Sequence, residues 1–253
     1  MPPPAAPVSV PSTPRSPRVA VVGLGGLGCP AAWCLARAGV SLRLMDEDRV
    51  EASNLHRQSL FGPDDVGRPK VEAAAEALRS CGVEVETLVE HLTPDRALAM
   101  LRGVDLVVEG SDNLGTKFLV ADACRALGLG VVHGASVGWH GTVLPVSPTT
   151  GACYRCVFED IPRGHDAVDC ATAGVWGPVT SVIGALMAAD ALRLLGGDLS
   201  QAGCIARYDG WTQRFRATPF PRRPDCPLCG VGAPSVALDP ARYTLECHAD
   251  EAP

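Results

Sequence analysis

The sequence predicts an α/β fold with a doubly wound, Rossmann-like and mostly parallel sheet, followed by a zinc-stapled C-terminal extension. The apolar run 19–22 leads into Gly23-Leu24-Gly25-Gly26-Leu27-Gly28 and then into an alanine-rich helical stretch. Strand and helix patterns alternate to about residue 135, as in parallel sheets covered by helices on both faces. Two Cys-x-x-Cys pairs follow, with the spacing of a zinc site.

The first strand, helix and second strand form one βαβ unit. The helix after the glycines runs to Arg37 and is stopped by Gly39, and the next strand, 41–45, ends at Asp46. Apolar spacing then predicts helices around 71–78 and 120–127 and strands at 83–89, 105–109 and from 131 onward. These elements form the nucleotide-binding half.

The rhythm changes after residue 140. We expect a strand at 142–146, a helix from about Pro178 to Leu195, and a hairpin of 204–208 and 211–216 around the Asp209-Gly210 turn pair. The predicted organisation is a Pro-rich disordered tail (1–17), an ATP-binding half (18–145), a zinc-bearing half of the same domain (146–235) and a flexible tail (236–253).

Composition excludes several classes of protein. The 253 residues are 47% hydrophobic and carry a net charge of −6, with scattered Lys and Arg, so nothing indicates binding to nucleic acid or to an anionic membrane. The first 17 residues contain seven prolines and no apolar core of a signal peptide. Eleven cysteines without a secretory signal favour a reducing compartment, and we predict a cytoplasmic protein.

The glycine motif has the context of an adenine-nucleotide site. It follows a strand and opens a helix, and Asp46 comes eighteen residues after its last glycine. The glycines let a phosphate approach the helix N-terminus, and Asp46 can accept hydrogen bonds from a ribose. This pattern alone leaves both a dinucleotide and ATP open.

Charged residues downstream favour nucleotidyl transfer over hydride transfer. Attack on an α-phosphate needs cations around the phosphates and a carboxylate for Mg²⁺. Arg57 and Lys70 are candidates for the cations and Asp112 for the carboxylate, although each alone could be a solvated surface charge.

These motifs together resemble those of the ThiF, MoeB and HesA proteins, bacterial relatives of ubiquitin-activating enzymes. The matching features are Gly-x-Gly-Gly-Leu-Gly, Asp-x-Asp-x-Val-x-x-Ser-Asn-Leu-x-Arg-Gln from Asp46, then Lys70 and Asp112-Asn113. The resemblance spans about residues 19–230. It implies an ATP-dependent adenylyltransferase that activates the C-terminal Gly-Gly carboxylate of a ubiquitin-like sulfur carrier, releases pyrophosphate and precedes sulfur transfer.

The resemblance also assigns residues. It places Gly25 against the phosphates, Asp46 on the ribose, Asn54 and Arg57 on ATP, Lys70 on the triphosphate and Asp112 on Mg²⁺. The full set of predicted nucleotide-binding residues is Gly23, Gly25, Gly26, Gly28, Asp46, Asp48, Ser53, Asn54, Arg57, Lys70, Asp112 and Asn113. A homodimer and a sulfurtransferase or cysteine desulfurase partner are further implications.

The cysteines divide into two roles. Cys153, Cys156, Cys226 and Cys229 suit a tetrahedral, closed and therefore structural Zn²⁺ site, and the family has zinc at the corresponding pairs. Cys170 lies in a polar loop before the long apolar helix. In ThiF-like members a cysteine there links covalently to the carrier, whereas MoeB-like members work without it, so a nucleophilic role for Cys170 stays open.

Two features depart from the family pattern. Relatives begin with an arginine-bearing helix that reaches the partner's ATP site, and this chain has only Arg15 and Arg18 near the first strand. Lys117 replaces the usual Arg after Asp-Asn-x-x-Thr, which predicts a different contact.

Three alternative functions stay open. They are adenylylation of another carboxylate or of tRNA, a non-catalytic nucleotide-binding scaffold, and an NAD-dependent oxidoreductase.

Overall fold

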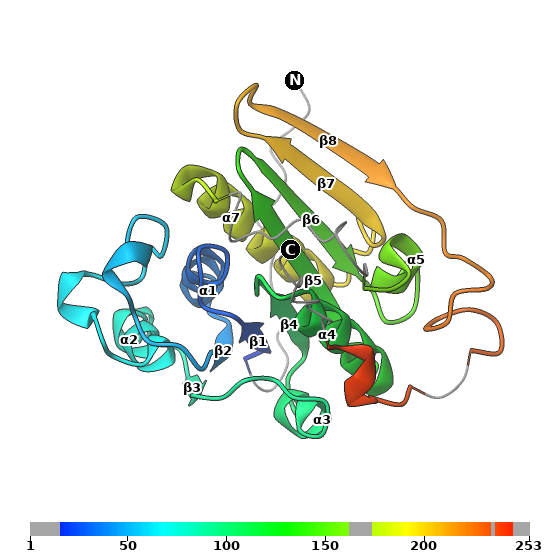
Figure 1. Ribbon diagram of the computed structural model, residues 1–253, viewed down its shortest axis with the longest axis horizontal. Helices are drawn as coiled ribbons and strands as arrows, with labels where there is room; N and C mark the ends of the chain where they lie inside the picture. Colours follow the sequence, from blue (N-terminus) through cyan, green and yellow to red (C-terminus); the bar gives the residue numbers. More distant parts are fainter. Residues whose placement is uncertain (1–15, 162–173, 234–235, 245–253) are drawn as a thin grey trace, which may run out of the picture.

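The computed structural model describes residues 16–161, 174–233 and 236–244. One eight-stranded sheet runs through the molecule in the order β3-β2-β1-β4-β5-β6-β7-β8 (Figure 1). The strands are β1 Arg18–Val22, β2 Ser41–Met45, β3 Val85–Leu88, β4 Leu106–Glu109, β5 Gly130–Val137, β6 His140–Val146, β7 Cys204–Asp209 and β8 Arg214–Pro219. The helices are α1 Gly28–Arg37, α2 Lys70–Ala77, α3 Ala97–Leu101, α4 Leu114–Leu127, α5 Tyr154–Phe158 and α7 Gly177–Leu195.

The first five strands pair in parallel, as the alternation of strand and helix patterns predicts. β1 lies at the centre of this half, between β2 and β4. The last three strands instead form an antiparallel meander on β5. The predicted α/β class and mostly parallel sheet are therefore confirmed.

The hairpin of β7 and β8 is longer at its tip than a two-residue turn. β7 ends at Asp209 and β8 begins at Arg214, so the loop has four residues. The Asp209 carboxylate accepts hydrogen bonds from the backbone of Trp211 and Thr212, which closes this wider loop.

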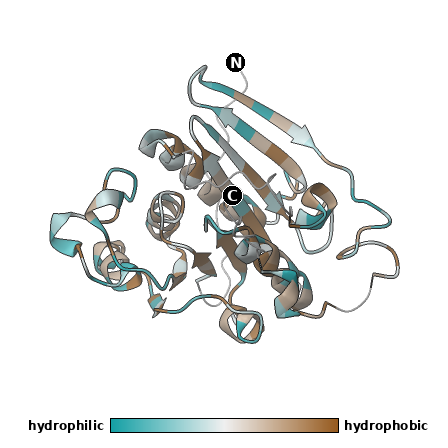
Figure 2. Ribbon diagram, in the orientation of Figure 1, coloured by the Kyte–Doolittle hydropathy of each residue, from teal (hydrophilic) through white to brown (hydrophobic). Residues whose placement is uncertain are grey.

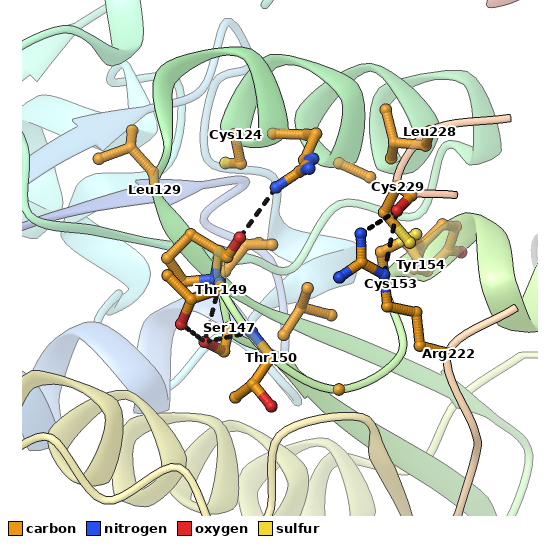
Figure 3. A pocket seen from close by; sticks show the side chains of 16 residues that line it. Cys124, Leu129, Ser147, Thr149, Thr150, Cys153, Tyr154, Arg222, Leu228 and Cys229 are labelled. Carbon is orange, nitrogen blue, oxygen red and sulfur yellow. Dashed lines mark hydrogen bonds between the residues drawn. The ribbon is translucent and has the colours of Figure 1, made fainter. Parts of the chain in front are cut away.

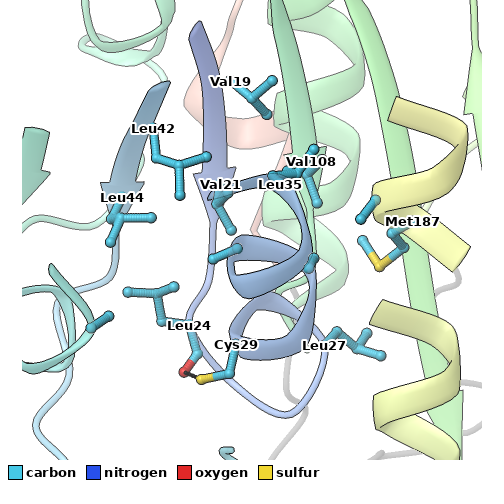
Figure 4. Close-up of a cluster of buried hydrophobic side chains, with 14 of the residues drawn as sticks. Val19, Val21, Leu24, Leu27, Cys29, Leu35, Leu42, Leu44, Val108 and Met187 are labelled. Atoms are coloured by element: carbon cyan, nitrogen blue, oxygen red, sulfur yellow. Dashed lines mark hydrogen bonds between the residues drawn. The ribbon is translucent and has the colours of Figure 1, made fainter. Parts of the chain in front are cut away.

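The hydrophobic core lies on both faces of the sheet. Along β1, Val19 and Val21 belong to the cluster beneath α1 and α7, whereas Ala20 and Val22 belong to the cluster beneath α3 and α4. This period of two is what a strand buried on both faces requires. Figure 4 shows the first cluster between β1, β2 and α1, and Figure 2 shows apolar residues concentrated in the central strands.

α7 is the longest helix of the described chain. By length and composition alone it is apolar enough to cross a membrane. Here it packs against α1, β5 and β6, and a Cβ on Gly184 would lie 2.5 Å from the Leu27 carbonyl of the α1 entry. Its buried hydrophobic residues, among them Val179, Ile183 and Met187, belong to the same core cluster as residues of α1.

The segment 236–244 lies within the predicted C-terminal tail and packs against α4. Tyr243 Oη donates a 2.8 Å hydrogen bond to the buried carboxylate of Asp122. A Cβ on Gly115 would lie 2.2 Å from the Tyr243 carbonyl, so the two backbones approach closely. Val236, Leu238 and Tyr243 pack against the core, whereas the other six residues of the segment are exposed.

Candidate active site

A large cleft opens at the carboxyl ends of the parallel strands, and residues of β6 to β8 form its opposite wall. It lies where β1 has β2 on one side and β4 on the other, the switch point at which open α/β sheets bind ligands. Ten of the twelve predicted nucleotide-binding residues line this cleft: Gly23, Gly25, Gly26, Asp46, Asp48, Asn54, Arg57, Lys70, Asp112 and Asn113.

The glycines of the first turn have different structural tasks. Gly23 has φ +85°, a conformation that side chains disfavour. A Cβ on Gly28 would lie 1.8 Å from the Gly23 carbonyl, so Gly28 allows α1 to approach the turn and does not line the cleft. Around Gly25 nothing lies within 4 Å of a built Cβ, which leaves its backbone open to a ligand.

Asp46 is fixed by the turns on either side of it. One carboxylate oxygen accepts a 2.7 Å hydrogen bond from the Leu24 amide and the other a 2.9 Å bond from the Asp48 amide. The buried Lys70 ammonium lies 3.8 Å from Asp46 and 2.7 Å from the exposed Asp48 carboxylate. The Lys70 ammonium is therefore held in the cleft, and its nearest counter-ion, Asp48, is exposed.

The loop after β2 presents Arg57 to the cleft. Arg57 Nη2 donates to the Asn54 side-chain oxygen, and the Asn54 amide in turn donates to Glu51 at 3.2 Å. Ser53 also donates to Glu51 at 3.2 Å and does not line the cleft, so its hydroxyl orders the loop.

Asp112 and Asn113 follow β4, and both residues are exposed. The Asp112 side chain is exposed and lines the cleft. Asn113 also lines it, and its side-chain oxygen accepts a 3.0 Å hydrogen bond from the Thr116 amide, which makes it the N-cap of α4.

A buried polar cluster beneath this turn was not identified as a functional group from the sequence. Lys117 lines the cleft, and its buried ammonium donates to Glu109 at 2.8 Å and to the Gly134 carbonyl at 2.6 Å. His133 Nδ1 lies 3.3 Å from the same Glu109 carboxylate. Burial alone would raise the Glu109 pKa, but Lys117 and His133 outweigh burial and lower that pKa to about 2. Burial also lowers the pKa of His133.

The four cysteines of the two Cys-x-x-Cys motifs meet in one buried cluster between α5 and the loop after β8. Their sulfur atoms all lie within 4.8 Å of one another, with 3.7 Å between Cys153 and Cys156, 3.5 Å between Cys153 and Cys226, and 3.4 Å between Cys156 and Cys229. Tetrahedral zinc with bonds of about 2.3 Å requires sulfur separations of about 3.8 Å. The donor set and its closeness fit a closed Zn²⁺ site.

The cysteine cluster is connected to the rest of the fold on two sides. Arg222 donates to the Cys229 carbonyl, close to Cys153 and Tyr154 (Figure 3). Tyr154 packs edge-on against Phe118 at 5.0 Å and lies 4.3 Å from the His133 ring. Phe118 and Tyr154 also line the cleft, so the cluster supports one of its walls.

The opposite wall carries exposed cations and aromatic rings. Arg207, Arg214 and Arg216 line the cleft, and their guanidinium groups have no hydrogen-bond or ion-pair partner among the described residues. Arg207 pairs with Arg216 across β7 and β8, so both side chains lie on one face of the hairpin.

The remaining sequence candidates are Cys170, Arg15 and Arg18. Cys170 and Arg15 lie outside the described residues. Arg18 is at the amino end of β1, where it forms a 2.7 Å ion pair with Glu84, and so it lies at the end of the strand opposite to the cleft.

The chain is similar to known proteins in sequence and in fold. The sequence pattern of the ThiF family matches residues 12–228. The SAMP-activating enzyme E1 of Haloferax volcanii is 41% identical over 228 residues, covering 88% of this chain and 83% of that protein. The sulfur carrier protein adenylyltransferase of Thermus thermophilus is 43% identical over 215 residues, covering 81% and 79%.

Two further similarities are partial. The adenylyltransferase and sulfurtransferase MOCS3 of Bos taurus is 43% identical over 211 residues, and the chain spans 46% of its length. The crystal structure of E. coli MccB with MccA-N7isoASN superposes with a TM-score of 0.76 at 23% identity, over 85% of this chain and 67% of MccB, which is a likeness of fold.

Proposed function

The chain belongs to the ThiF family, and from this premise we propose that it adenylylates the C-terminal Gly-Gly carboxylate of a ubiquitin-like sulfur-carrier protein. The family and its relatives named adenylyltransferase make the chain an ATP-dependent adenylyltransferase. The observation that carries the proposal is that Arg57, Lys70 and Asp112, distant in sequence, line one cleft with the glycine turn.

The proposed reaction is an in-line displacement at the α-phosphorus of ATP. A carrier carboxylate oxygen attacks that phosphorus, a new P–O bond forms, and the bond to the β-phosphate breaks with its electron pair leaving on pyrophosphate. The attacking carboxylate is ionised at neutral pH, so the site needs no general base.

The chain's own residues would hold the nucleotide in place. Asp46 is positioned to accept from the ribose hydroxyls, and the open backbone at Gly25 admits the phosphates. Arg57 and Lys70 would neutralise charge on the triphosphate, and a phosphate would replace Asp48 as the partner of Lys70. Asp112 would hold Mg²⁺, which screens the phosphates when bound with ATP.

The four cysteines would hold a structural Zn²⁺ and join α5 to the C-terminal loop. Cys170 as a nucleophile in sulfur transfer, a sulfurtransferase or cysteine desulfurase partner, a homodimer and a cytoplasmic location stay predictions. The arginines of the opposite wall favour a carrier whose face near its C-terminus is acidic, because Arg207, Arg214 and Arg216 have no counter-ion among the described residues.

The test is Mg²⁺-dependent exchange of label between pyrophosphate and ATP, stimulated by a carrier ending in Gly-Gly. We expect exchange in the native chain, its loss in Arg57→Ala and little change in Arg79→Ala, a matched variant of an exposed arginine outside the cleft. If the chain binds ATP but shows no exchange of label with any carrier that ends in Gly-Gly, the result would favour a non-catalytic nucleotide-binding scaffold.

A further inference from the structure

A buried carboxylate lies directly beneath the turn that carries Asp112. Glu109 is the last residue of β4 and is fully buried. Its Oε1 accepts a 2.8 Å hydrogen bond from the Ser111 amide and another from the Ser111 hydroxyl. Its Oε2 faces Lys117 Nζ at 2.8 Å and His133 Nδ1 at 3.3 Å. One oxygen therefore holds the turn, and the other holds the balancing cation.

The turn at 110–112 packs closely against the glycine turn at 23–28. A Cβ on Gly23 would lie 3.0 Å from the Ser111 amide nitrogen, and a Cβ on Gly110 would lie 3.3 Å from the Gly28 nitrogen. The two turns have little space between them. A shift of Ser111 would therefore change the place of Asp112 relative to the glycines that receive the phosphates.

We propose that Glu109 is a positioning residue for Asp112: by fixing both donors of Ser111, it holds the Asp112 carboxylate at the point where Mg²⁺ arrives with ATP. This inference rests on the function proposed above. Lys117, which also lines the cleft, supplies the charge that keeps the buried carboxylate in place.

The alternative is that the ion pair only supports packing. Replacing a buried ion pair by uncharged residues of similar volume is often neutral for stability, whereas removing one partner is costly. The double variant Glu109→Gln/Lys117→Met removes both charges together. It separates the two roles, because packing can be retained while the anchor of Ser111 is weakened.

The experiment measures Mn²⁺ binding, by electron paramagnetic resonance, to the full chain with a non-hydrolysable ATP analogue, together with the thermal unfolding midpoint. We expect the double variant to keep a midpoint close to that of the native chain and to bind Mn²⁺ about 10-fold more weakly, as found when outer partners of metal ligands are changed. Asp112→Asn should weaken Mn²⁺ binding at least as much. Glu86→Gln, the same change in β3 outside the cleft, should leave it unchanged.

Native Mn²⁺ affinity in a folded double variant would overturn the proposal. If that variant does not fold, Ser111→Ala decides, because it removes the hydroxyl that donates to Glu109, together with its longer 3.5 Å contact to the Asn113 carbonyl, and leaves the ion pair of Glu109 and Lys117 intact. Weaker Mn²⁺ binding in Ser111→Ala supports the proposal, and unchanged binding overturns it. Failure of the proposed adenylylation has a different signature, namely native Mn²⁺ binding without carrier-stimulated exchange.

Discussion

The guanidinium of Arg155 forms a two-pronged ion pair with the carboxylate of Asp122. Its Nε and Nη2 lie 2.8 and 2.9 Å from the two carboxylate oxygens, and both side chains are buried. Arg155 lies between Cys153 and Cys156, whereas Asp122 is on α4. The pair therefore joins the cysteine cluster to the helix whose N-terminus borders the cleft.

Asp122→Ala should destabilise the protein by about 3–5 kcal/mol, because it removes the buried carboxylate and leaves Arg155 with only the exposed Asp160 as an ion-pair partner, at 3.3 Å. The measurement is the free energy of unfolding in urea. Asp198→Ala, which breaks the exposed ion pair with Arg193, is the control and should cost far less, because solvent screens exposed ion pairs. Equal losses in the two variants would contradict a special role for the buried pair.

Removal of the Zn²⁺ proposed at the cysteine cluster should unfold the C-terminal half of the structure. We expect about one zinc per chain by elemental analysis, and Cys226→Ser should lose the metal and lower the unfolding midpoint, because the site exists only in the folded chain. Cys204→Ser changes a cysteine outside the cluster and should retain the zinc. A zinc-free native protein with an unchanged midpoint would rule out a structural metal.

Two glycines of the first turn should respond in opposite ways to alanine. Gly28→Ala should prevent correct folding, because its Cβ would overlap the Gly23 carbonyl. Gly25→Ala should fold normally, since nothing lies within 4 Å of its Cβ, and should weaken ATP binding by occupying the space that the phosphates need. Unfolding midpoints and ATP titrations check both. If folded Gly25→Ala binds ATP with normal affinity, the phosphates do not lie against the backbone of Gly25.

The sequence predicted the parallel half of the fold because β1 and β4 are short, strongly apolar strands and helical patterns alternate with the strands of this half. It did not reveal the short helices α3 and α5, which are only five residues long and carry too little periodicity. The cysteine cluster was predictable because its spacing is itself the signal, and its closeness in the structure agrees with that spacing.

The buried cluster around Glu109 was harder to predict. Glu109 ends an apolar strand, Lys117 follows a helix cap, and His133 lies in another strand, so no spacing rule joins them. Each charge looks like a surface residue until the sheet brings β4 and β5 side by side. A carboxylate at the end of an otherwise apolar strand was the one available signal.

The arginines of the β7–β8 hairpin should control the affinity for the carrier without changing the affinity for ATP. Arg207→Glu/Arg216→Glu should raise the KM for an acidic carrier in pyrophosphate exchange about 10-fold or more, because like charges would now face one another at the encounter. The native reaction should lose affinity for the carrier as salt rises, and the variant should lose less. ATP binding serves as the internal control. A carrier variant with lysines on its acidic face should recover part of the loss, and an unchanged KM in the charge-reversed chain would show that the carrier docks on another surface.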